Sequence, residues 1–464
     1  MQPLSGLDAS FLYLETPSQV LHICGLLTLD ASTMPGGYSF GEFRRRLSER
    51  IAEIPEFRRK LHNSPANLLH PVWVEDPDFD VTRHLHRVAV PAPGGREELA
   101  ELCAHFAGQP LDRARPLWEM YVIEGLPDDG VAVLLKMHHA TADGAAGANL
   151  IAYLCGLEPD SLLPLPDAAE NPEPPSHLDL LRSSITSLAK RPVELAKLLP
   201  DLVSMAPEWV GRALKRSGMP VPFTAPRTSF NRTITGLRTV AYTSLDLDEI
   251  KRVKNAFGVT VNDVVLALCA GALRRYLEER GELPGQPLVA TVPVSTQDRT
   301  ENGHGSNQVS AFFASLPTQL ADPAARVYAI AESNRLAKEH HFSLKPDMLR
   351  DWAQFAAPRL FGLAVRAYSG LRLAEKHPVV HNLVISNVPG PPTPLYLLGA
   401  RIEGLYPLGP VFHGAGLNVT VISNAGRVDV GLLGARELVP ELWPLADAVT
   451  AEMAELLQVA DGLA

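Results

Sequence analysis

The sequence predicts an α/β protein made of two lobes, on three observations. The chain has 464 residues, which exceeds the size at which a single hydrophobic core stops growing, so two domains are expected. Helix-like and strand-like stretches alternate on both sides of a proline-rich segment. That segment, residues 158–177, contains six prolines and cannot hold regular structure for long. We therefore predict a first lobe at residues 1–157, a linker and helical connector at 158–225, and a second lobe at 226–464.

In the first lobe, the patterning predicts helices at residues 40–54 and 96–108 and a strand at 72–76. Two further strand-like stretches, residues 118–125 and 131–139, are separated by the turn sequence LPDDG. They are predicted to form a hairpin. Trp118, in the first of these strands, is most simply a core residue.

In the second lobe the same alternation returns. Thr260 and Asp263 fit a capping box at the start of a helix, with Asp263 reaching back to the backbone of Thr260. Helices are predicted at residues 247–258 and 262–281, and strands at 239–245, 287–295, 307–316, 381–388, 417–423 and 428–434.

Residues 182–216, within the connector, are helix-prone and interrupted by three prolines. Basic residues outnumber acidic ones there and alternate with apolar residues. This pattern fits a solvated connector packed on the lobes. It also fits contact with a membrane or a lipid droplet. We favour the solvated connector.

Composition excludes several classes of function. The net charge of −10 provides no basic field for a nucleic acid backbone. The longest apolar run, residues 264–273, is about half the length needed to span a bilayer. The N-terminus lacks the features of a secretory signal, and four widely spaced cysteines fit buried, reduced thiols. We expect a cytoplasmic protein, at most peripheral on the inner membrane face or on lipid droplets.

The strongest local signal is HHATADG at residues 138–144, where the second strand of the hairpin ends. A side chain there is held by rigid backbone and faces an open edge, as a general base requires. Histidine can take a proton from a hydroxyl and return it to a departing thiolate. Asp143 is placed to fix the loop, and Gly144 permits a sharp exit. Taken alone, the histidine pair fits structural residues equally well.

HHATADG also fits HHxxxDG, the signature of the acyltransferase superfamily that includes chloramphenicol acetyltransferase and peptide-synthetase condensation domains. More narrowly, the chain resembles the bacterial, mycobacterial-type wax ester synthase/acyl-CoA:diacylglycerol acyltransferase family. Gln297 departs from the arginine expected after PVST in relatives. The motifs that carry the resemblance span nearly the whole chain: LSGLDASFLYLE at 4–15, PLW at 116–118, Asn262-Asp263, PVST at 293–296, GSNQVS at 305–310 and SNVPGP at 386–391.

The resemblance implies two chloramphenicol-acetyltransferase-like lobes, each a mixed β-sheet with flanking helices, that enclose a central tunnel. It implies that His139 is the catalytic base, that His138 supports it, and that Asp143 and Gly144 shape the loop. It implies acyl-CoA as a substrate, diacylglycerol or a long-chain alcohol as the acceptor, and neither a cofactor nor a metal. The substrate-binding candidates are Asn262, Gln308 and Asn387.

Some alternatives stay open. The capping box explains Asp263 but leaves Asn262 free to line the tunnel, whereas Asn387, which precedes two prolines, fits a structural turn at least as well. The same fold could take acyl groups from carrier-protein thioesters, or it could bind lipids without catalysis.

Two motif matches are set aside. Ser39 lies in GYSFG, which matches the nucleophile elbow of serine hydrolases, but no strand precedes it. Ser39 and Glu42 instead fit a helix capping box. His84 and His86 form a weak metal motif without a cluster of ligands nearby in the sequence.

Overall fold

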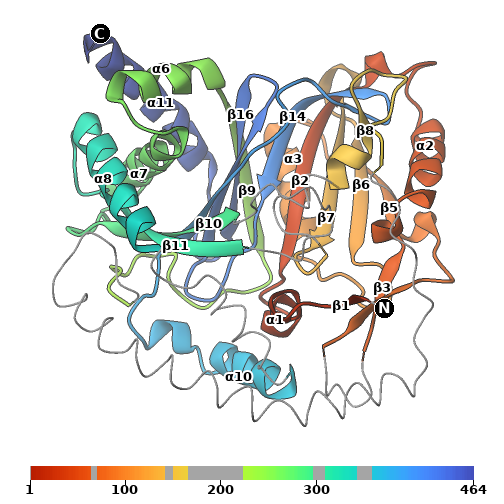
Figure 1. The fold of residues 1–464 in the computed structure, drawn as a ribbon, viewed down its shortest axis with the longest axis horizontal. Coiled ribbons are helices and arrows are strands. Elements are labelled where there is room, and N and C mark those ends of the chain that lie inside the picture. Colours follow the sequence, from red (N-terminus) through yellow and green to blue (C-terminus); the bar gives the residue numbers. More distant parts are fainter. Residues whose placement is uncertain are drawn as a thin grey trace.

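The chain folds around two large β-sheets of seven and six strands and a small sheet of three, with helices packed around them (Figure 1). This is the mixed α/β architecture that the sequence predicts. The linker beyond residue 165 and the connector 182–216 lie outside the described residues, as do Asp143, Gly144 and Gln308. The structure, a computed structural model, describes residues 2–63, 70–141, 150–165, 223–295, 309–341 and 358–463.

The sheet of the first lobe has the strand order β5-β6-β7-β2-β14-β13-β8. β6 and β7 pair antiparallel across a short turn, with Trp118 opposite Met137, which confirms the predicted hairpin. β2 lies antiparallel on the other side of β7. The strands are β2 His22–Asp30, β5 Leu85–Ala89, β6 Trp118–Glu124, β7 Val131–His138, β8 Cys155–Gly156, β13 Tyr396–Leu397 and β14 Ala400–Leu408.

Helices cover both faces of this sheet, so β7 is buried along its whole length. Val133 and Leu135 pack in one core cluster with residues of α2, whereas Ala132 and Leu134 pack in another with residues of α3. The alternation follows from the two-residue period of a strand. The helices of this part are α1 Gly6–Leu14, α2 Phe40–Ala52 and α3 Arg96–Ala107, and the small sheet holds β1 Gln2–Pro3, β3 Arg59–His62 and β4 Val72–Glu75.

Two strands of the first sheet come from the segment predicted for the second lobe. β14 pairs with β2, with Leu405 opposite Leu27. Asp429 of β16 is fully buried, and its Oδ2 accepts a hydrogen bond from the Leu405 backbone N–H at 2.9 Å. A Cβ at Gly431 would lie 1.9 Å from the carbonyl oxygen of Pro407, so glycine lets β16 approach β14 this closely. The first sheet therefore contains strands from both predicted lobes, so the two sheets do not correspond to two successive stretches of the chain.

The sheet of the second lobe has the order β11-β10-β12-β15-β16-β9, and β10, β12 and β15 are parallel neighbours. The strands are β9 Arg238–Asp246, β10 Leu288–Ser295, β11 Val309–Leu316, β12 Leu383–Val388, β15 Leu417–Asn424 and β16 Arg427–Ala435. The helices are α6 Leu247–Phe257, α7 Val261–Glu279, α8 Pro323–His341, α10 Pro358–Gly370 and α11 Trp443–Leu463.

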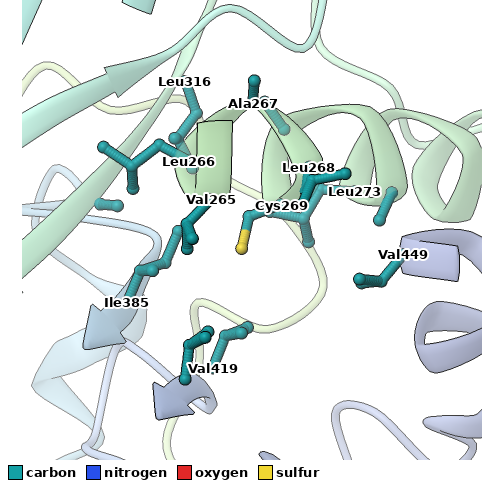
Figure 2. Packing of buried hydrophobic residues seen from close by; sticks show 14 of the residues in the cluster. Val265, Leu266, Ala267, Leu268, Cys269, Leu273, Leu316, Ile385, Val419 and Val449 are labelled. Carbon is teal, nitrogen blue, oxygen red and sulfur yellow. The ribbon is translucent and has the colours of Figure 1, made fainter. Parts of the chain in front are cut away.

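The apolar run 264–273 lies in α7, the central helix of the second lobe's core. Val265 and Cys269 pack there with Ile385 and Val419 of the sheet and Val449 of α11 (Figure 2). The run is therefore buried inside the lobe. Among the described residues, no single helix has the length and hydropathy to cross a bilayer. α6 and α7 meet those criteria only as a pair, across a bend of 100°.

Local sequence signals are confirmed at two helix starts. The Thr260 hydroxyl caps α7 and Asp263 reaches back to the Thr260 backbone N–H at 2.9 Å. The Ser39 hydroxyl accepts a hydrogen bond from the Glu42 backbone N–H and caps α2, so it is occupied as a helix cap.

Other predicted core residues are also confirmed. Trp118 is buried, donates its indole N–H to the carbonyl of Phe57 and stacks on His84. His86 stacks on Tyr121 instead of pairing with His84. Four cysteines, Cys24, Cys103, Cys155 and Cys269, are buried free thiols.

Candidate active site

His138 is the last residue of β7, and contacts of both its backbone and its ring fix its position. It pairs with His22 across the β2–β7 ladder, and its backbone N–H donates to the carbonyl of Leu117 at 3.0 Å. Its side chain is only 1% exposed. The ring Nδ1 accepts a hydrogen bond from the Ala140 backbone N–H at 3.0 Å, so in the neutral ring the proton is on Nε2.

A carboxylate at the end of α1 faces this ring. Oε1 of Glu15 lies 3.5 Å from Nε2 of His138 and 3.2 Å from Nε2 of His22. Arg113 donates to Oε2 of the same carboxylate at 2.5 Å. Burial by itself would raise the pKa of Glu15, but the contacts with His138 and His22 outweigh burial and hold that pKa well below its usual range. Glu15 is therefore ionised.

His22 completes this cluster from the start of β2. Its ring lies edge-on to the ring of His138, with centroids 5.8 Å apart. Burial lowers the pKa of His22 to about 4, although Glu15 acts in the opposite direction. Near neutral pH the cluster therefore places an ionised Glu15 beside the neutral ring of His22, the ring of His138 and Arg113.

His139 is the first residue beyond β7, and the residue is partly exposed, with its Nδ1 buried. Its backbone N–H donates to the carbonyl of Leu21 at 2.9 Å, and the Leu21 backbone N–H donates to Oε1 of Glu15 at 3.1 Å. The ring of His139 stacks on Phe11 of α1, with centroids 4.1 Å apart and planes 22° apart. The same carboxylate thus anchors His138 directly and His139 through one backbone residue.

The second lobe holds the chain that connects α1 to β2. Oε1 of Gln19 accepts a hydrogen bond from the His413 backbone N–H at 2.8 Å. Arg238 donates to the carbonyl of Ser18 at 2.8 Å. The support of the histidine pair therefore includes residues of both lobes, although α1 itself lies beneath the ends of β2 and β7 (Figure 1).

Two of the predicted substrate-binding residues meet each other. Asn387, at the end of β12, donates from Nδ2 to Oδ1 of Asn262 in the first turn of α7, at 3.4 Å. Asn387 is exposed and Asn262 is partly buried. Asp263, by contrast, is buried and also accepts a hydrogen bond from Asn334 at 2.7 Å. The structure thus brings Asn262 of α7 and Asn387 of β12 together in the second lobe, whereas His138 and His139 lie at the end of β7 in the first.

Family models match both halves of the chain. The model of the wax ester synthase/diacylglycerol acyltransferase catalytic domain matches residues 4–265, and that of the family's C-terminal domain matches residues 305–457. The chain belongs to this family.

Relatives and solved structures agree with the assignment to the wax ester synthase/diacylglycerol acyltransferase family. Two Mycobacterium tuberculosis proteins with diacylglycerol O-acyltransferase in their names are 49% and 36% identical over 462 and 460 residues. The alignments cover 99% and 97% of this chain and 91% and 98% of the relatives. The wax ester synthase/diacylglycerol acyltransferase from Marinobacter aquaeolei VT8 is 31% identical, with a TM-score of 0.69 over 99% of this chain and 100% of that one.

A more distant structure shows the shared fold alone. The first condensation domain of the calcium-dependent antibiotic synthetase has a TM-score of 0.56 at 14% identity, over 99% of this chain and 96% of that one. The two-lobe fold implied by the sequence resemblance is confirmed. The tunnel and the roles of individual residues stay predictions.

Sequence reasoning missed four residues of this family member's histidine cluster: Phe11, Glu15, His22 and Arg113. Phe11 and Glu15 lie in LSGLDASFLYLE, a motif that carries the family resemblance but assigns no role to either residue. A carboxylate that ends a helix just before a strand starting with histidine was the available signal. His22 and Arg113 reach the cluster only through non-local pairing of strands and loops.

Proposed function

We propose that the chain is an O-acyltransferase that moves a long-chain fatty acyl group from acyl-CoA to the hydroxyl of diacylglycerol. Long-chain alcohols are the second acceptor class. One observation carries this proposal: His139 lies at the end of a buried strand, its backbone fixed to Leu21 and its ring fixed on Phe11. The names of the aligned relatives support the substrate classes.

His139 acts as the general base in this proposal. Its imidazole takes the proton of the acceptor hydroxyl while the hydroxyl oxygen attacks the thioester carbonyl. The new C–O bond forms, the C–S bond breaks, and the imidazolium returns the proton to the departing thiolate of coenzyme A. Both substrates are bound together, so no acyl-enzyme is needed. Acyl-CoA is already an activated donor, so the proposed step requires neither metal nor cofactor.

His138 is better suited to positioning than to proton transfer. Its Nδ1 is occupied by the Ala140 backbone N–H, and its Nε2 faces Glu15 in a nearly inaccessible setting. A ring held in this way orients the strand end and leaves the neighbouring ring to meet the substrate.

The remaining predicted residues have supporting roles in the proposal. Asp143 and Gly144 fix the loop that follows His139. Asn262, Gln308 and Asn387 bind substrate. The pairing of Asn262 with Asn387 supports a shared role for these two amides.

We place the reaction in the cytoplasm, at the inner membrane face or a lipid-droplet surface. Diacylglycerol is a membrane lipid, so a peripheral enzyme must meet it at such a surface. The four buried free thiols suit a reducing compartment.

The experiment is a turnover assay with radiolabelled long-chain acyl-CoA and diacylglycerol, followed by separation of the neutral lipids. The wild-type protein should yield triacylglycerol. His139→Ala should lose about 10²- to 10⁴-fold in turnover, the usual contribution of a general base, while it retains acyl-CoA binding. Wild-type turnover in His139→Ala would remove the proposed base. Transfer from an acylated carrier protein but not from acyl-CoA would overturn the proposed donor.

A further inference from the structure

The helix α10 exposes an apolar stripe on the surface of the second half of the chain. Leu363 and Leu371 are 65% and 59% exposed. Ala367 lies between them at four-residue spacing and is also exposed. Leu371 directly follows the last residue of α10, and its backbone N–H donates to the carbonyl of Ala367 at 2.9 Å, which continues the helical turn. The three residues therefore lie on one side, because residues four apart in a helix are neighbours on its surface.

The opposite side of α10 packs on the protein. Gly362, Val365 and Ser369 are partly buried. A Cβ at Gly362 would lie 3.9 Å from the carbonyl oxygen of Tyr13, so α10 rests against α1. A surface helix usually buries its apolar side and exposes polar residues. In α10 leucines point away from the protein.

Phe223 extends this apolar surface beyond the helix. Its side chain is 56% exposed, and its ring meets the edge of His377 with centroids 6.2 Å apart. Nε2 of His377 is hydrogen-bonded in turn to the hydroxyl of Tyr368 in α10, at 2.6 Å. Phe223 therefore lies near the C-terminal end of the leucine stripe.

Basic charge is concentrated in the same segment of an acidic chain. Residues 358–377 contain four Lys or Arg and one Glu, although the whole chain has a net charge of −10. Arg372 pairs with that glutamate, Glu375, at 2.8 Å. Arg366 and Lys376 are exposed, and neither has a carboxylate within ion-pair distance among the residues that the structure describes.

We propose that this surface, hereafter the α10 face (Phe223, Leu363, Arg366, Ala367, Leu371 and Lys376), docks on an anionic phospholipid membrane. Exposed leucines with nearby cations are the composition of a helix that lies in the membrane interface, with apolar side chains among the acyl chains and cations at the phosphates. The apolar stripe gives the surface its affinity, and the cations select anionic lipids.

The position of the α10 face gives docking a consequence for the site. α10 contacts α1, and α1 carries Phe11, the residue stacked on His139 (Figure 1). A membrane on the α10 face would therefore lie beside the element that holds the histidine. This consequence rests on the proposed function, whereas docking itself does not.

The test is co-sedimentation of the full chain with vesicles, without acyl-CoA. The vesicles are phosphatidylcholine alone or mixed with phosphatidylglycerol. The wild type should bind the anionic vesicles more tightly, and the double variant Leu363→Ser/Leu371→Ser should bind them at least about tenfold more weakly. Arg366→Gln/Lys376→Gln should lose about tenfold on anionic vesicles and change little on phosphatidylcholine.

Leu463→Ser is the matched control, because Leu463 is 52% exposed at the end of α11, on the far side of the molecule from α10. It should bind like the wild type.

Docking is overturned if the wild type does not bind, or if Leu463→Ser loses as much binding as the double variant. It is also overturned if the α10 variants instead convert a dimer into a monomer, which would assign the α10 face to a second copy of the chain. Thermal unfolding of each variant shows whether weaker binding comes from a folding defect. If Leu363→Ser/Leu371→Ser unfolds, Leu363→Ala/Leu371→Ala is used in its place. Because these measurements involve no turnover, their failure leaves the proposed acyl transfer untouched.

Discussion

The ring of Phe11 stacks on the ring of His139 at a centroid distance of 4.1 Å, and this contact joins α1 to the end of β7. Ala9 and Leu12 of α1 are buried with Leu117 and Ala140, so the helix is fixed on the same strand ends. Phe11 therefore packs against the imidazole of the proposed base, while the Leu21 carbonyl fixes the backbone of the same residue. A base held in this way needs little reorganisation when the substrate arrives.

Replacing Phe11 should slow the reaction without unfolding the protein. Phe11→Ala removes an aromatic contact worth about 1 kcal/mol and weakens the positioning of the imidazole, so we expect kcat to fall about tenfold. KM for acyl-CoA should change little. Phe11→Tyr, which keeps the ring, should retain most activity. Steady-state assays of both variants check this, and unchanged kcat in Phe11→Ala would contradict the positioning role.

We expect the contacts of Glu15 with His22 and His138 to contribute more to stability than its ion pair with Arg113. Glu15→Gln removes the charge that faces His22 and His138, and we expect the free energy of unfolding to fall by about 2 kcal/mol, because contacts with a charged carboxylate are stronger than those with the neutral amide that replaces it. Arg113→Gln removes an ion-pair partner that is 47% exposed, so its cost should stay below about 1 kcal/mol. Urea unfolding of both variants decides, and equal losses would mean that the ion pair is the main contribution.

The order of elements and their local endings follow from the sequence because they depend on neighbouring residues. The β6–β7 hairpin, the capping of α7 by Thr260 and the buried run in α7 all result from local patterning. The resemblance supplied His138 and His139, and the structure places both at the strand end that the pattern predicts.

What the sequence did not predict depends on pairing between distant segments. β14 enters the first sheet because Asp429 and Gly431 of β16 fit against it, which no local pattern reveals. Glu15 reaches His138 only once β2 has paired with β7. The same limit applies to Asn387, whose partner Asn262 lies on a different element.

Asp263 and Asn262 are neighbours at the start of α7, and we expect their replacement to affect different properties: stability for Asp263 and substrate binding for Asn262. Asp263→Ala removes the reciprocal cap on Thr260 and leaves the buried amide of Asn334 without its acceptor, so we expect a loss of about 2 to 3 kcal/mol in unfolding free energy. Asn262→Ala breaks one long hydrogen bond near the surface and should cost less than about 1 kcal/mol. We expect Asn262→Ala instead to raise KM for acyl-CoA or for the acceptor. A normal KM in Asn262→Ala would remove its proposed binding role.

Acid should destabilise the fold through three histidines, His22, His381 and His413. Burial lowers the pKa of each to about 4, and for His413 the nearby Arg238 adds to the effect. In the unfolded chain their pKa returns to about 6.5, so between these values the unfolded state binds more protons than the folded state. Their contribution to stability is therefore complete above about pH 6.5 and is lost as the pH falls toward 4.

His381 offers the cleanest measurement of this effect. Neither ring nitrogen has a hydrogen-bond partner within the described part of the chain, so replacing the ring breaks no bond there. His381→Leu should match the wild type within about 1 kcal/mol at pH 7.5, since the swap removes little but a neutral buried ring. At pH 5 the variant should be the more stable by about 2 kcal/mol, because it no longer has a proton to take up on unfolding. Urea unfolding at both pH values measures the difference. If the two proteins lose stability in parallel from pH 7.5 to 5, His381 carries its proton in the folded state, and the neutral ring inferred from its burial is wrong.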